Sequence, residues 1–460
     1  MSVVATDAQA VHGAGVQRLL ASYRAVPPAA TVRLRKPTSN LFRARERNAA
    51  PGLDTSGLTG VISVDAHTRT ADVSGMCTYE ELVAATLPYG LSPLVVPQLK
   101  TITLGGAVTG LGIESASFRN GLPHESVLEL DILTGAGEIV TANRDLHSDL
   151  FRAFPNSYGT LGYAVRLRIE LEPVAPYVAL RHLRFHSLDE LVAAMDRIIE
   201  TRGYQGVPVH YLDGVVFSAD ESYLCLGFQT DTAGPVSDYT GREIYYRSIQ
   251  HDHGERHDRL TIADYLWRWD TDWFWCSRAF GAQHPVLRRL WPRRYRRSSF
   301  YWKLIGYDRR FGIADRIEKR NGRPPRERVV QDVEVPLENC GAFLNWFLDN
   351  VPIEPIWLCP LRLRDQGAQW PLYPLRPHHS YVNIGFWSSV PAGPAPGHTN
   401  RLIERKVSEL DGHKSLYSES FYSADEFDAR YGGEAYRAVK TVYDPDGRLL
   451  DLYAKAVQNR

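Results

Sequence analysis

The hydrophobic and polar positions of the first third of the chain follow an order of strand, turn, strand and helix. In residues 60–90, two short β-branched segments flank a polar turn and lead into an apolar stripe with helical spacing. Thr78 and Glu81 have the spacing of a capping box, and Gly90 is placed to end the helix in a left-handed conformation. The pattern therefore predicts a hairpin followed by a capped helix.

A second unit of the same kind follows. Residues 127–143 predict two strands around a glycine turn, and a short helix is expected near residues 145–153. Residues 163–171 alternate between apolar and charged side chains, which is typical of a half-buried strand. Because Pro173 breaks this pattern, we place a domain boundary there, and residues 1–173 form the first predicted domain.

The sequence after residue 173 has a different pattern of residues. Residues 174–424 contain aromatic-rich strands, such as 221–229, separated by long polar stretches with prolines, and this predicts an antiparallel sheet with helices. Residues 425–460 are mainly helical with a break at Pro445, and we expect this tail to return to the first domain. The fold class is therefore α+β, with a two-part first domain and an antiparallel-sheet cap.

Composition excludes several function classes. The chain has 460 residues, and its 53 Lys plus Arg equal its 53 Asp plus Glu, so the basic excess typical of nucleic-acid binding is lacking. The five cysteines never form a CxxC pair and fit neither a disulfide framework nor a zinc site, so no metal is expected. Without a signal peptide or an apolar run of about 18 residues, the sequence predicts a cytoplasmic protein with no membrane span.

The most informative stretch is PQLKTITLGGAVTGLGIESASFRNG, which places Gly105, Gly106, Gly110 and Gly112 within eight residues. Glycine lets the backbone approach a ligand closely, and exposed amide groups suit phosphate oxygens. The run is not a GxGxxG fingerprint that follows a strand and opens a helix. A tight packing loop is the alternative interpretation.

Two more loops narrow the interpretation: RKPTSNLFR, residues 35–43, and NSYGTLGY, residues 156–163. Three such loops in this order, with TxGG at residues 103–106, resemble the FAD-binding domain (PCMH type) of the vanillyl-alcohol-oxidase superfamily. The resemblance implies three groups of cofactor contacts. The first contacts the pyrophosphate, the second the pyrophosphate and the flavin ring, and the third the adenine side: Thr38, Ser39 and Asn40; Thr103, Gly105, Gly106, Gly110, Gly112, Ser115 and Ser117; and Gly159, Gly162 and Tyr163.

The same resemblance bears on how the flavin is held. Many members tether it to a histidine or cysteine, but RKPTSNLFR and TGLGIESAS contain neither, so non-covalent FAD is expected. VKTVYDP resembles the closing motif of the superfamily, in which a lysine approaches the flavin. Lys440 is therefore a candidate for stabilising negative charge on the reduced ring, and a solvated helix lysine is the alternative.

A further resemblance covers nearly the whole chain. LPYGLSPLVVPQL, GGAVTGLGIESAS, VVQDVEVP, PIWLCP and YSESFYSADEF are similar to the delta-24-sterol reductase family, which reduces an isolated carbon-carbon double bond using FAD and NADPH. We expect the chain to differ from that family in lacking an N-terminal membrane anchor. It also resembles actinobacterial reductases that convert a methylene-branched acyl chain of a phospholipid to the methyl-branched, tuberculostearic type. That resemblance implies a lipid substrate and an upstream lipid methyltransferase as a candidate partner.

An isolated alkene has no carbonyl to accept hydride, so its reduction needs an acid near the flavin N5 and a dry pocket. Glu114 is the first candidate, because the resemblance puts its loop beside the flavin ring and burial raises a carboxyl pKa. A carboxylate that bonds the ribityl chain of the flavin or a neighbouring amide is the alternative. Gln331, Glu334, Tyr381 and His379 are weaker candidates on the cap.

One segment of the cap predicts contact with a membrane. Six of the ten tryptophans lie between Trp267 and Trp302, and RRLWPRRYRR brings six arginines together: Arg288, Arg289, Arg293, Arg294, Arg296 and Arg297. Aromatic side chains suit a bilayer interface and arginines attract anionic headgroups, so we expect peripheral docking on the inner face of the plasma membrane. A tryptophan core beside a solvated basic loop is the alternative.

Fold alone does not choose the reaction. The alternatives to reduction of an acyl-chain alkene are an FAD-dependent oxidase or dehydrogenase of a sugar lactone or polyol, a sterol side-chain reductase, and a flavin-binding lipid carrier without turnover.

Overall fold

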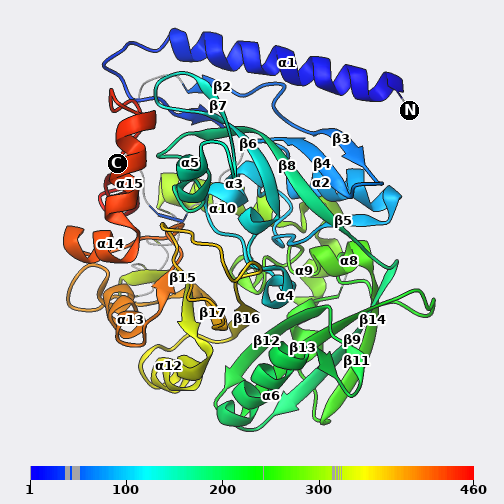
Figure 1. The fold of residues 1–460 in the computed structure, drawn as a ribbon. Coiled ribbons are helices and arrows are strands. Elements are labelled where there is room, and N and C mark those ends of the chain that lie inside the picture. The colour runs from blue at the N-terminus through cyan, green and yellow to red at the C-terminus, as the bar shows by residue number, and fades with distance from the viewer. Residues whose placement is uncertain are drawn as a thin grey trace.

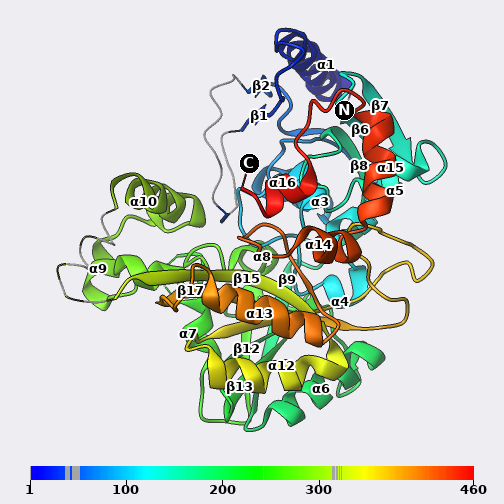
Figure 2. The ribbon, with the colours of Figure 1, turned by 90° about the vertical axis from the view of Figure 1, so that its left-hand side faces the viewer.

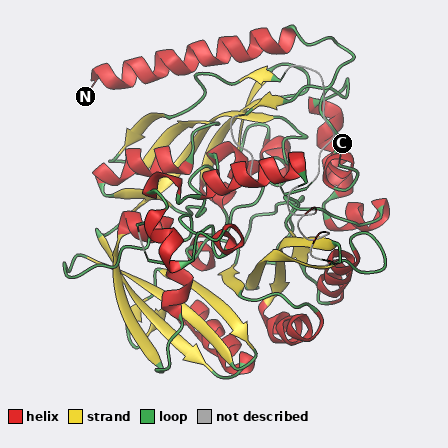
Figure 3. Cartoon of the chain, turned by 180° about the vertical axis from the view of Figure 1, so that it is seen from behind, coloured by secondary structure: helices red, strands yellow, loops and turns green. Residues whose placement is uncertain are grey.

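The computed structural model describes residues 2–36, 42–43, 52–241, 243–312, 316, 320, 322 and 324–459. Within them two large antiparallel sheets divide the molecule (Figures 1 and 3). The smaller sheet has the order β3-β4-β8-β6-β7, and β5 pairs with β8. Its strands are β3 Val61–Asp65, β4 Thr70–Ser74, β5 Leu91–Pro93, β6 Val127–Leu133, β7 Ile139–Asn143 and β8 Tyr163–Pro173.

The predicted local structure of this domain is confirmed at both hairpins and at the capped helix. Helix α2, Tyr79–Thr86, begins with the capping box of Thr78 and Glu81. A 3₁₀ turn, η1 Leu87–Tyr89, follows, and Gly90 then adopts a φ of 68°. In the glycine-rich stretch, however, the sequence predicted only a loop. Leu104–Thr109 forms the short helix α3, because the Thr103 side chain caps it by accepting from the Gly106 amide.

The other elements of the first part of the chain surround this sheet. Helix α1, Ser2–Arg24, runs along the outside of the domain (Figure 1) and was not anticipated. The remaining elements are β1 Leu34–Arg35, β2 Leu53–Asp54, α4 Ser117–Asn120, η2 Pro123–Ser126 and α5 Ser148–Ala153. The first two pair in parallel and lie between the N-terminal helix and the rest of the domain.

The larger sheet has the order β14-β9-β13-β12-β16-β17-β15-β18. Its strands are β9 Tyr177–Phe185, β12 Tyr211–Ser218, β13 Glu221–Thr230, β14 Glu255–Thr261, β15 Arg326–Pro336, β16 Ile356–Leu361, β17 Tyr381–Pro391 and β18 His413–Lys414. Three helices pack on it, α6 Leu188–Thr201, α12 Leu337–Asn350 and α13 His398–Glu409 (Figure 2). A small hairpin, β10 Gly203–Tyr204 with β11 Val207–Pro208, follows the first of these helices. The predicted antiparallel-sheet cap is therefore confirmed.

The two faces of the larger sheet have different cores. The face under the three helices is packed mainly with aliphatic side chains, together with several phenylalanines. The opposite face carries aromatic side chains that join the core of the first domain. The segment between β14 and β15 covers this aromatic side with α8 Ile262–Trp267, η3 Cys276–Phe280, α9 Pro285–Leu290, η4 Arg293–Tyr295 and α10 Ser298–Phe311, while α7 Tyr245–Ile249 precedes β14.

The C-terminal tail consists of α14 Ala424–Arg430, α15 Gly433–Tyr443 and α16 Leu452–Ala456. It lies against the first domain (Figure 1), as Ala136 N donates to Tyr443 O at 3.1 Å and Val32 N donates to Arg448 O at 2.8 Å. The residues on either side of the predicted boundary at 173 belong to strands of different sheets.

Candidate active site

A cavity of about 750 Å³ lies between the first domain and the aromatic side of the larger sheet, because its walls take residues from both. This volume is within the range of small-molecule sites. Seven of the residues that the sequence assigned to the cofactor line it: Thr103, Gly105, Gly106, Gly110, Gly112, Gly159 and Tyr163. The glycine-rich stretch of residues 103–112 and the loop at residues 159–163, which are far apart in the sequence, therefore meet at one cavity.

Other predicted cofactor residues lie elsewhere. Ser115 and Ser117 are buried beneath the cavity wall, where the Ser117 hydroxyl accepts from the Glu114 amide at 3.1 Å. Gly162 has a φ of 142° and packs against β6. Thr38, Ser39 and Asn40 fall outside the described residues.

Two glycines of the 103–112 stretch are required by close packing. A Cβ on Gly105 would lie 2.6 Å from the carbonyl oxygen of Gly75, and a Cβ on Gly106 would lie 2.8 Å from the Thr103 hydroxyl oxygen. Both glycines also line the cavity. The packing interpretation therefore holds for them, and their place on the wall agrees with the ligand interpretation as well.

Cations line the part of the cavity that the first domain and the tail form. Arg33, Lys36 and Lys455 are all wall residues. Lys455 Nζ also donates to the backbone oxygen of Tyr158 at 2.7 Å, which links α16 to the third loop. Positive side chains beside glycine loops suit a diphosphate.

One buried polar atom at the wall supports a bound polar ligand. Gln98 lines the cavity, and its Oε1 is buried without a hydrogen-bond partner among the described residues. Buried amide groups are nearly always paired in folded proteins, so this atom suits a donor that a cofactor provides. The loops, the cations and this orphaned oxygen together fit the dinucleotide FAD.

Aromatic side chains form the rest of the wall. Phe274 packs on Trp387 with ring centroids 4.4 Å apart and on Trp357 at 5.3 Å. Phe42 packs on Trp273 at 5.7 Å from the side of the first domain. All five residues line the cavity, so this part excludes water and suits an apolar substrate.

Asp332 is the only acidic residue on the wall among the described residues, and sequence reasoning missed it. Asn383 Nδ2 donates to its carboxylate at 3.2 Å, and the Tyr417 hydroxyl bonds to it as well. Trp387 Nε1 in turn donates to the Tyr417 hydroxyl at 3.0 Å. Burial raises the pKa of Asp332 to about 6, although these hydrogen bonds act in the opposite direction.

A cross-strand glycine makes room for this carboxyl group. Gly385 on β17 pairs with Asp332 on β15. A Cβ at that glycine would lie 2.5 Å from Asp332 Oδ1 and 2.6 Å from the ring of Trp387. Glycine in a strand often marks such a close approach, and here it lets an acid and an indole ring share one place on the wall.

Glu114, the acid predicted from the sequence, is held in a buried ion cluster and is not a wall residue. Gln98 and Ser115 donate to its carboxylate. Arg268 pairs with two carboxylates, that of Glu114 at 3.3 Å and that of Asp213 at 2.9 Å. Burial raises the pKa of Glu114, while the arginine lowers it. The alternative weighed from the sequence, a carboxylate bonded to a neighbouring amide, describes this geometry.

Lys440 is also absent from the described wall. Its Nζ donates to Thr160 O at 2.7 Å, Leu449 O at 2.9 Å and Leu450 O at 3.2 Å, and it pairs with Asp444 at 2.7 Å. Burial lowers its pKa, which the aspartate partly offsets. The lysine therefore ties the tail to the third glycine loop, and Leu450 carries this contact to the wall.

The weaker candidates on the cap do not line the cavity in the described part of the chain. Gln331 bonds to Asn400 at 2.5 Å, and the Tyr381 hydroxyl accepts from the Arg376 amide at 3.1 Å. Glu334 is buried and accepts from Ser415 at 3.0 Å. His379 Nδ1 lies 2.9 Å from a carbonyl oxygen of its own loop.

The tryptophans of the Trp267–Trp302 segment belong mainly to the core. Trp267, Trp269, Trp273 and Trp275 are buried, and the other two are half-buried. As the alternative interpretation held, these rings form a core. Contact with a membrane remains a prediction, and it must rest on other side chains of the segment.

Comparison with known proteins agrees with the geometry of the site. A family model described as an FAD binding domain matches residues 28–143. The Delta(24)-sterol reductase of Mus musculus is 26% identical over 86% of this chain and 76% of that protein, and the Arabidopsis thaliana enzyme is 25% identical over 89% and 77%. Cytokinin dehydrogenase 7 of Oryza sativa subsp. japonica is 32% identical over 38% of this chain and 34% of its own length.

These comparisons confirm the predicted resemblance and the enzyme class, an FAD-linked oxidoreductase related to the sterol reductases. Among the described residues, no group of His, Cys, Asp and Glu could hold a metal ion. No helix in that part of the chain combines the length and the apolar character that crossing a bilayer requires.

Proposed function

We propose that this FAD-linked oxidoreductase uses NADPH to reduce an isolated carbon-carbon double bond in a lipid, converting a methylene-branched acyl chain of a phospholipid to its methyl-branched form. The observation that carries the proposal is the aromatic wall with one carboxyl group, Asp332, whose pKa is raised to about 6. An alkene has no polar handle, so its reduction requires this combination of a dry pocket and an acid.

The chain supplies the proton. Protonated Asp332 gives its proton to the terminal methylene carbon, and the positive charge then forms at the tertiary carbon. Tyr417 and Asn383 hold the carboxyl group in place and stabilise the carboxylate that is left. The aromatic rings exclude water, which would otherwise trap the cation. The tertiary carbon then accepts hydride, so one proton from the acid and one hydride, which carries both electrons, are added across the double bond.

FAD, once reduced by NADPH, supplies the hydride when it is bound. Arg33, Lys36 and Lys455 would hold its diphosphate beside the backbone of Gly106 and Gly110, which line the same cavity. No histidine or cysteine is among the described wall residues, which supports non-covalent binding. No separate nicotinamide site is needed if both substrates use one face of the flavin in turn.

The competing functions make different demands on the same cavity. A sugar or polyol substrate needs several hydrogen-bonding groups where the aromatic wall stands, and an oxidase would use ionised Asp332 as a base. A sterol side-chain reductase shares the alkene chemistry, and the similarity to sterol reductases favours it as the second candidate.

Anaerobic absorbance of the purified protein tests the proposal. NADPH should bleach the bound flavin, and a phospholipid with a methylene-branched acyl chain should restore its colour, with the methyl-branched product identified by mass spectrometry. A sterol with a double bond in its side chain is the matched comparison. If only the sterol restores the colour, the substrate is a sterol and not a phospholipid. If a polyol bleaches the flavin and only oxygen restores the colour, the protein is an oxidase and not an alkene reductase.

A further inference from the structure

We propose that residues 285–311 present a docking face that binds an anionic phospholipid bilayer and delivers an acyl chain to the cavity. The docking face is defined by six exposed apolar side chains and three exposed cations: Val286, Leu287, Leu290, Tyr295, Tyr307 and Phe311, with Arg289, Arg294 and Lys303. The delivery of the acyl chain rests on the proposed function, whereas the binding to the bilayer does not.

Exposed apolar side chains concentrate in this segment. It holds six of the thirteen large hydrophobic residues that are exposed in the described part of the chain, although it is only 27 residues long. Leu290 is 75% exposed, Tyr307 60% and Val286 59%. Single exposed apolar residues are normal on a protein surface, but a concentration of them marks an interaction site.

Helix α10 has two distinct faces. Leu304 and Ile305 are half-buried and pack against the aromatic core. Lys303, Tyr307 and Phe311 recur every four residues and are exposed, so they form one stripe along the helix, which lies beside Leu304 and faces away from Ile305. An aromatic and basic face of this kind suits the headgroup region of a bilayer, where aromatic rings and cations are both stabilised.

The charges of the segment fall into two groups with different roles. Arg289, Arg294 and Lys303 are exposed and form no ion pair within the described residues. Arg293 is exposed too, but it pairs with Asp238 at 2.5 Å. The segment therefore keeps cations available beside its apolar side chains, and the complementary partner is a surface that is both apolar and negatively charged.

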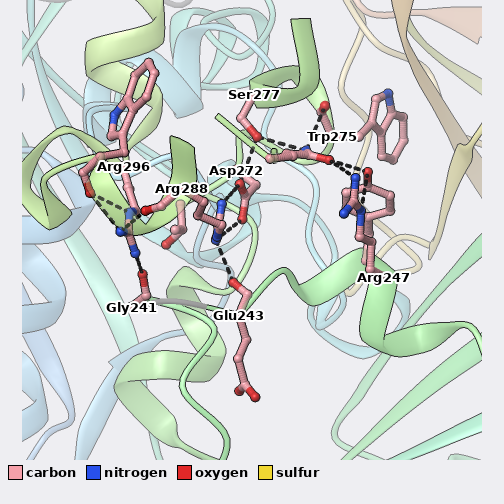
Figure 4. A network of polar contacts seen from close by, with 12 residues as sticks. Gly241, Glu243, Arg247, Asp272, Trp275, Ser277, Arg288 and Arg296 are labelled. Carbon is pink, nitrogen blue, oxygen red and sulfur yellow. Dashed lines mark hydrogen bonds and ion pairs between the residues drawn. The ribbon is translucent and has the colours of Figure 1, made fainter. Parts of the chain in front are cut away.

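The other arginines fix the segment to the body of the cap (Figure 4). Arg288 donates to both carboxylate oxygens of Asp272, at 2.7 and 2.9 Å, and to Glu243 O at 2.8 Å. Arg296 donates to the backbone oxygens of Gly241 and Arg288. These buried contacts hold α9 and η4 in place before any partner arrives, so docking does not need a folding step.

The docking face is connected to the cavity through Trp302 on α10. Its ring packs on Phe42 at 4.6 Å and on Trp273 at 5.3 Å, and both of these residues line the cavity. Figure 2 shows α9 and α10 standing out together at one edge of the molecule. An acyl chain that enters the cavity from the side of α10 therefore meets the aromatic wall residues Phe42 and Trp273 first.

Vesicle flotation with the full-length holoenzyme tests the docking face. We expect binding to vesicles of phosphatidylglycerol and phosphatidylcholine, weaker binding to phosphatidylcholine alone, and loss with rising salt because exposed charges are screened. Arg289→Glu and Arg294→Glu should each weaken binding at least fivefold, the equivalent of about 1 kcal/mol per basic residue. Leu290→Glu should weaken it at all salt concentrations.

Matched controls lie elsewhere on the surface. Leu146→Glu changes a leucine that is 49% exposed, and Arg405→Glu changes an exposed arginine on α13. Both should bind vesicles as the unchanged protein does. Equal binding by the docking-face variants and these controls would overturn the inference. It would also be overturned if the unchanged protein binds no vesicles and light scattering shows a dimer that Leu290→Glu converts to a monomer.

Turnover separates this inference from the proposed function. The docking-face variants should reduce a methylene-branched lipid in detergent micelles at the normal rate and lose activity only on vesicles. If the holoenzyme binds vesicles through this face but reduces no such lipid in micelles or vesicles, the proposed function fails while the docking face stands.

Discussion

Asp332 is the residue on which the proposed chemistry depends. If its protonated form is the acid, turnover of the reduced enzyme should fall about tenfold per pH unit above pH 6, because its pKa is about 6. Asp332→Asn cannot donate this proton, so the rate of alkene reduction should drop by about 10²- to 10⁴-fold and become independent of pH. Stopped-flow reoxidation of the flavin by the lipid measures both effects.

Glu114→Gln is the matched comparison, since it changes another buried carboxyl group whose pKa is raised. Because Glu114 lies in a buried ion cluster and is not a wall residue, we expect Glu114→Gln to leave the chemical step unchanged. Should Glu114→Gln abolish reoxidation while Asp332→Asn reoxidises normally, the acid predicted from the sequence would be the correct one.

The raised pKa of Asp332 also predicts that this carboxyl group lowers the stability of the protein at neutral pH, although it serves the reaction. A carboxyl group with a pKa of about 6 in the folded protein and about 4 unfolded makes the folded state bind more protons between these values. The free energy of unfolding therefore falls as pH rises through this window. Asp332→Asn removes the penalty and should stabilise the protein by about 1 to 3 kcal/mol at pH 7.

Urea unfolding at pH 4 and pH 7 measures this difference, which should vanish at the lower pH. A variant that is more stable yet inactive cannot owe its inactivity to misfolding. If Asp332→Asn and the unchanged protein have equal free energies of unfolding at pH 7 as well as at pH 4, the pKa of Asp332 is not raised.

At the scale of elements, strand alternation could have identified the acid. Side chains of β15 alternate between two faces, so Asp332 and Glu334 point to the same side and Gln331 to the other. Gln331 and Glu334 were both predicted as candidates, although this period puts them on opposite faces of the strand. The strand period alone does not predict that only Asp332 reaches the wall, because that depends on Gly385 in the neighbouring strand.

Local signals predicted other elements well. The capping box fixed the start of α2, and glycine turns fixed the hairpins, because these signals act within a few residues. The glycine-rich stretch was predicted to be a loop, whereas Thr103 caps a helix there. Glycine is a poor helix former, and the packing of Gly105 against Gly75 outweighs that preference.

Lys440 gives a test at the junction of α15 and the third glycine loop. Lys440→Met removes donors from three backbone carbonyls and leaves Asp444 buried beside them. An uncompensated buried charge costs about 3 to 5 kcal/mol, so we expect a lower melting temperature and weaker retention of FAD.

The flavin reduction potential of the fraction that keeps FAD should stay unchanged, because the ammonium group is not a described wall residue. Spectroscopic titration with a reference dye measures it. A clear fall in potential would support the role predicted from the sequence, stabilisation of negative charge on the reduced ring.

At the scale of the whole molecule, the cavity exists only because distant segments meet. Phe42 N donates to Tyr417 O at 2.8 Å, and the ring of Phe42 packs on Trp273 and Trp302. The first domain thus completes a wall that the cap begins. No periodicity or motif brings residues 42 and 417 together, so the sequence predicted the cofactor loops but not the aromatic wall.

A ligand held between two domains should couple their unfolding. FAD that binds only the folded protein at 100 times its dissociation constant adds about 2.7 kcal/mol. We therefore expect one calorimetric transition for the holoprotein, at a temperature that rises with free FAD. Removal of FAD should lower the melting of the cap as well as of the first domain, because Phe42, Tyr417 and the glycine loops share the cavity. Tryptophan fluorescence reports on the cap, where Trp273, Trp357 and Trp387 lie. If the melting temperature reported by tryptophan fluorescence is the same with and without FAD, the cofactor is held by the first domain alone.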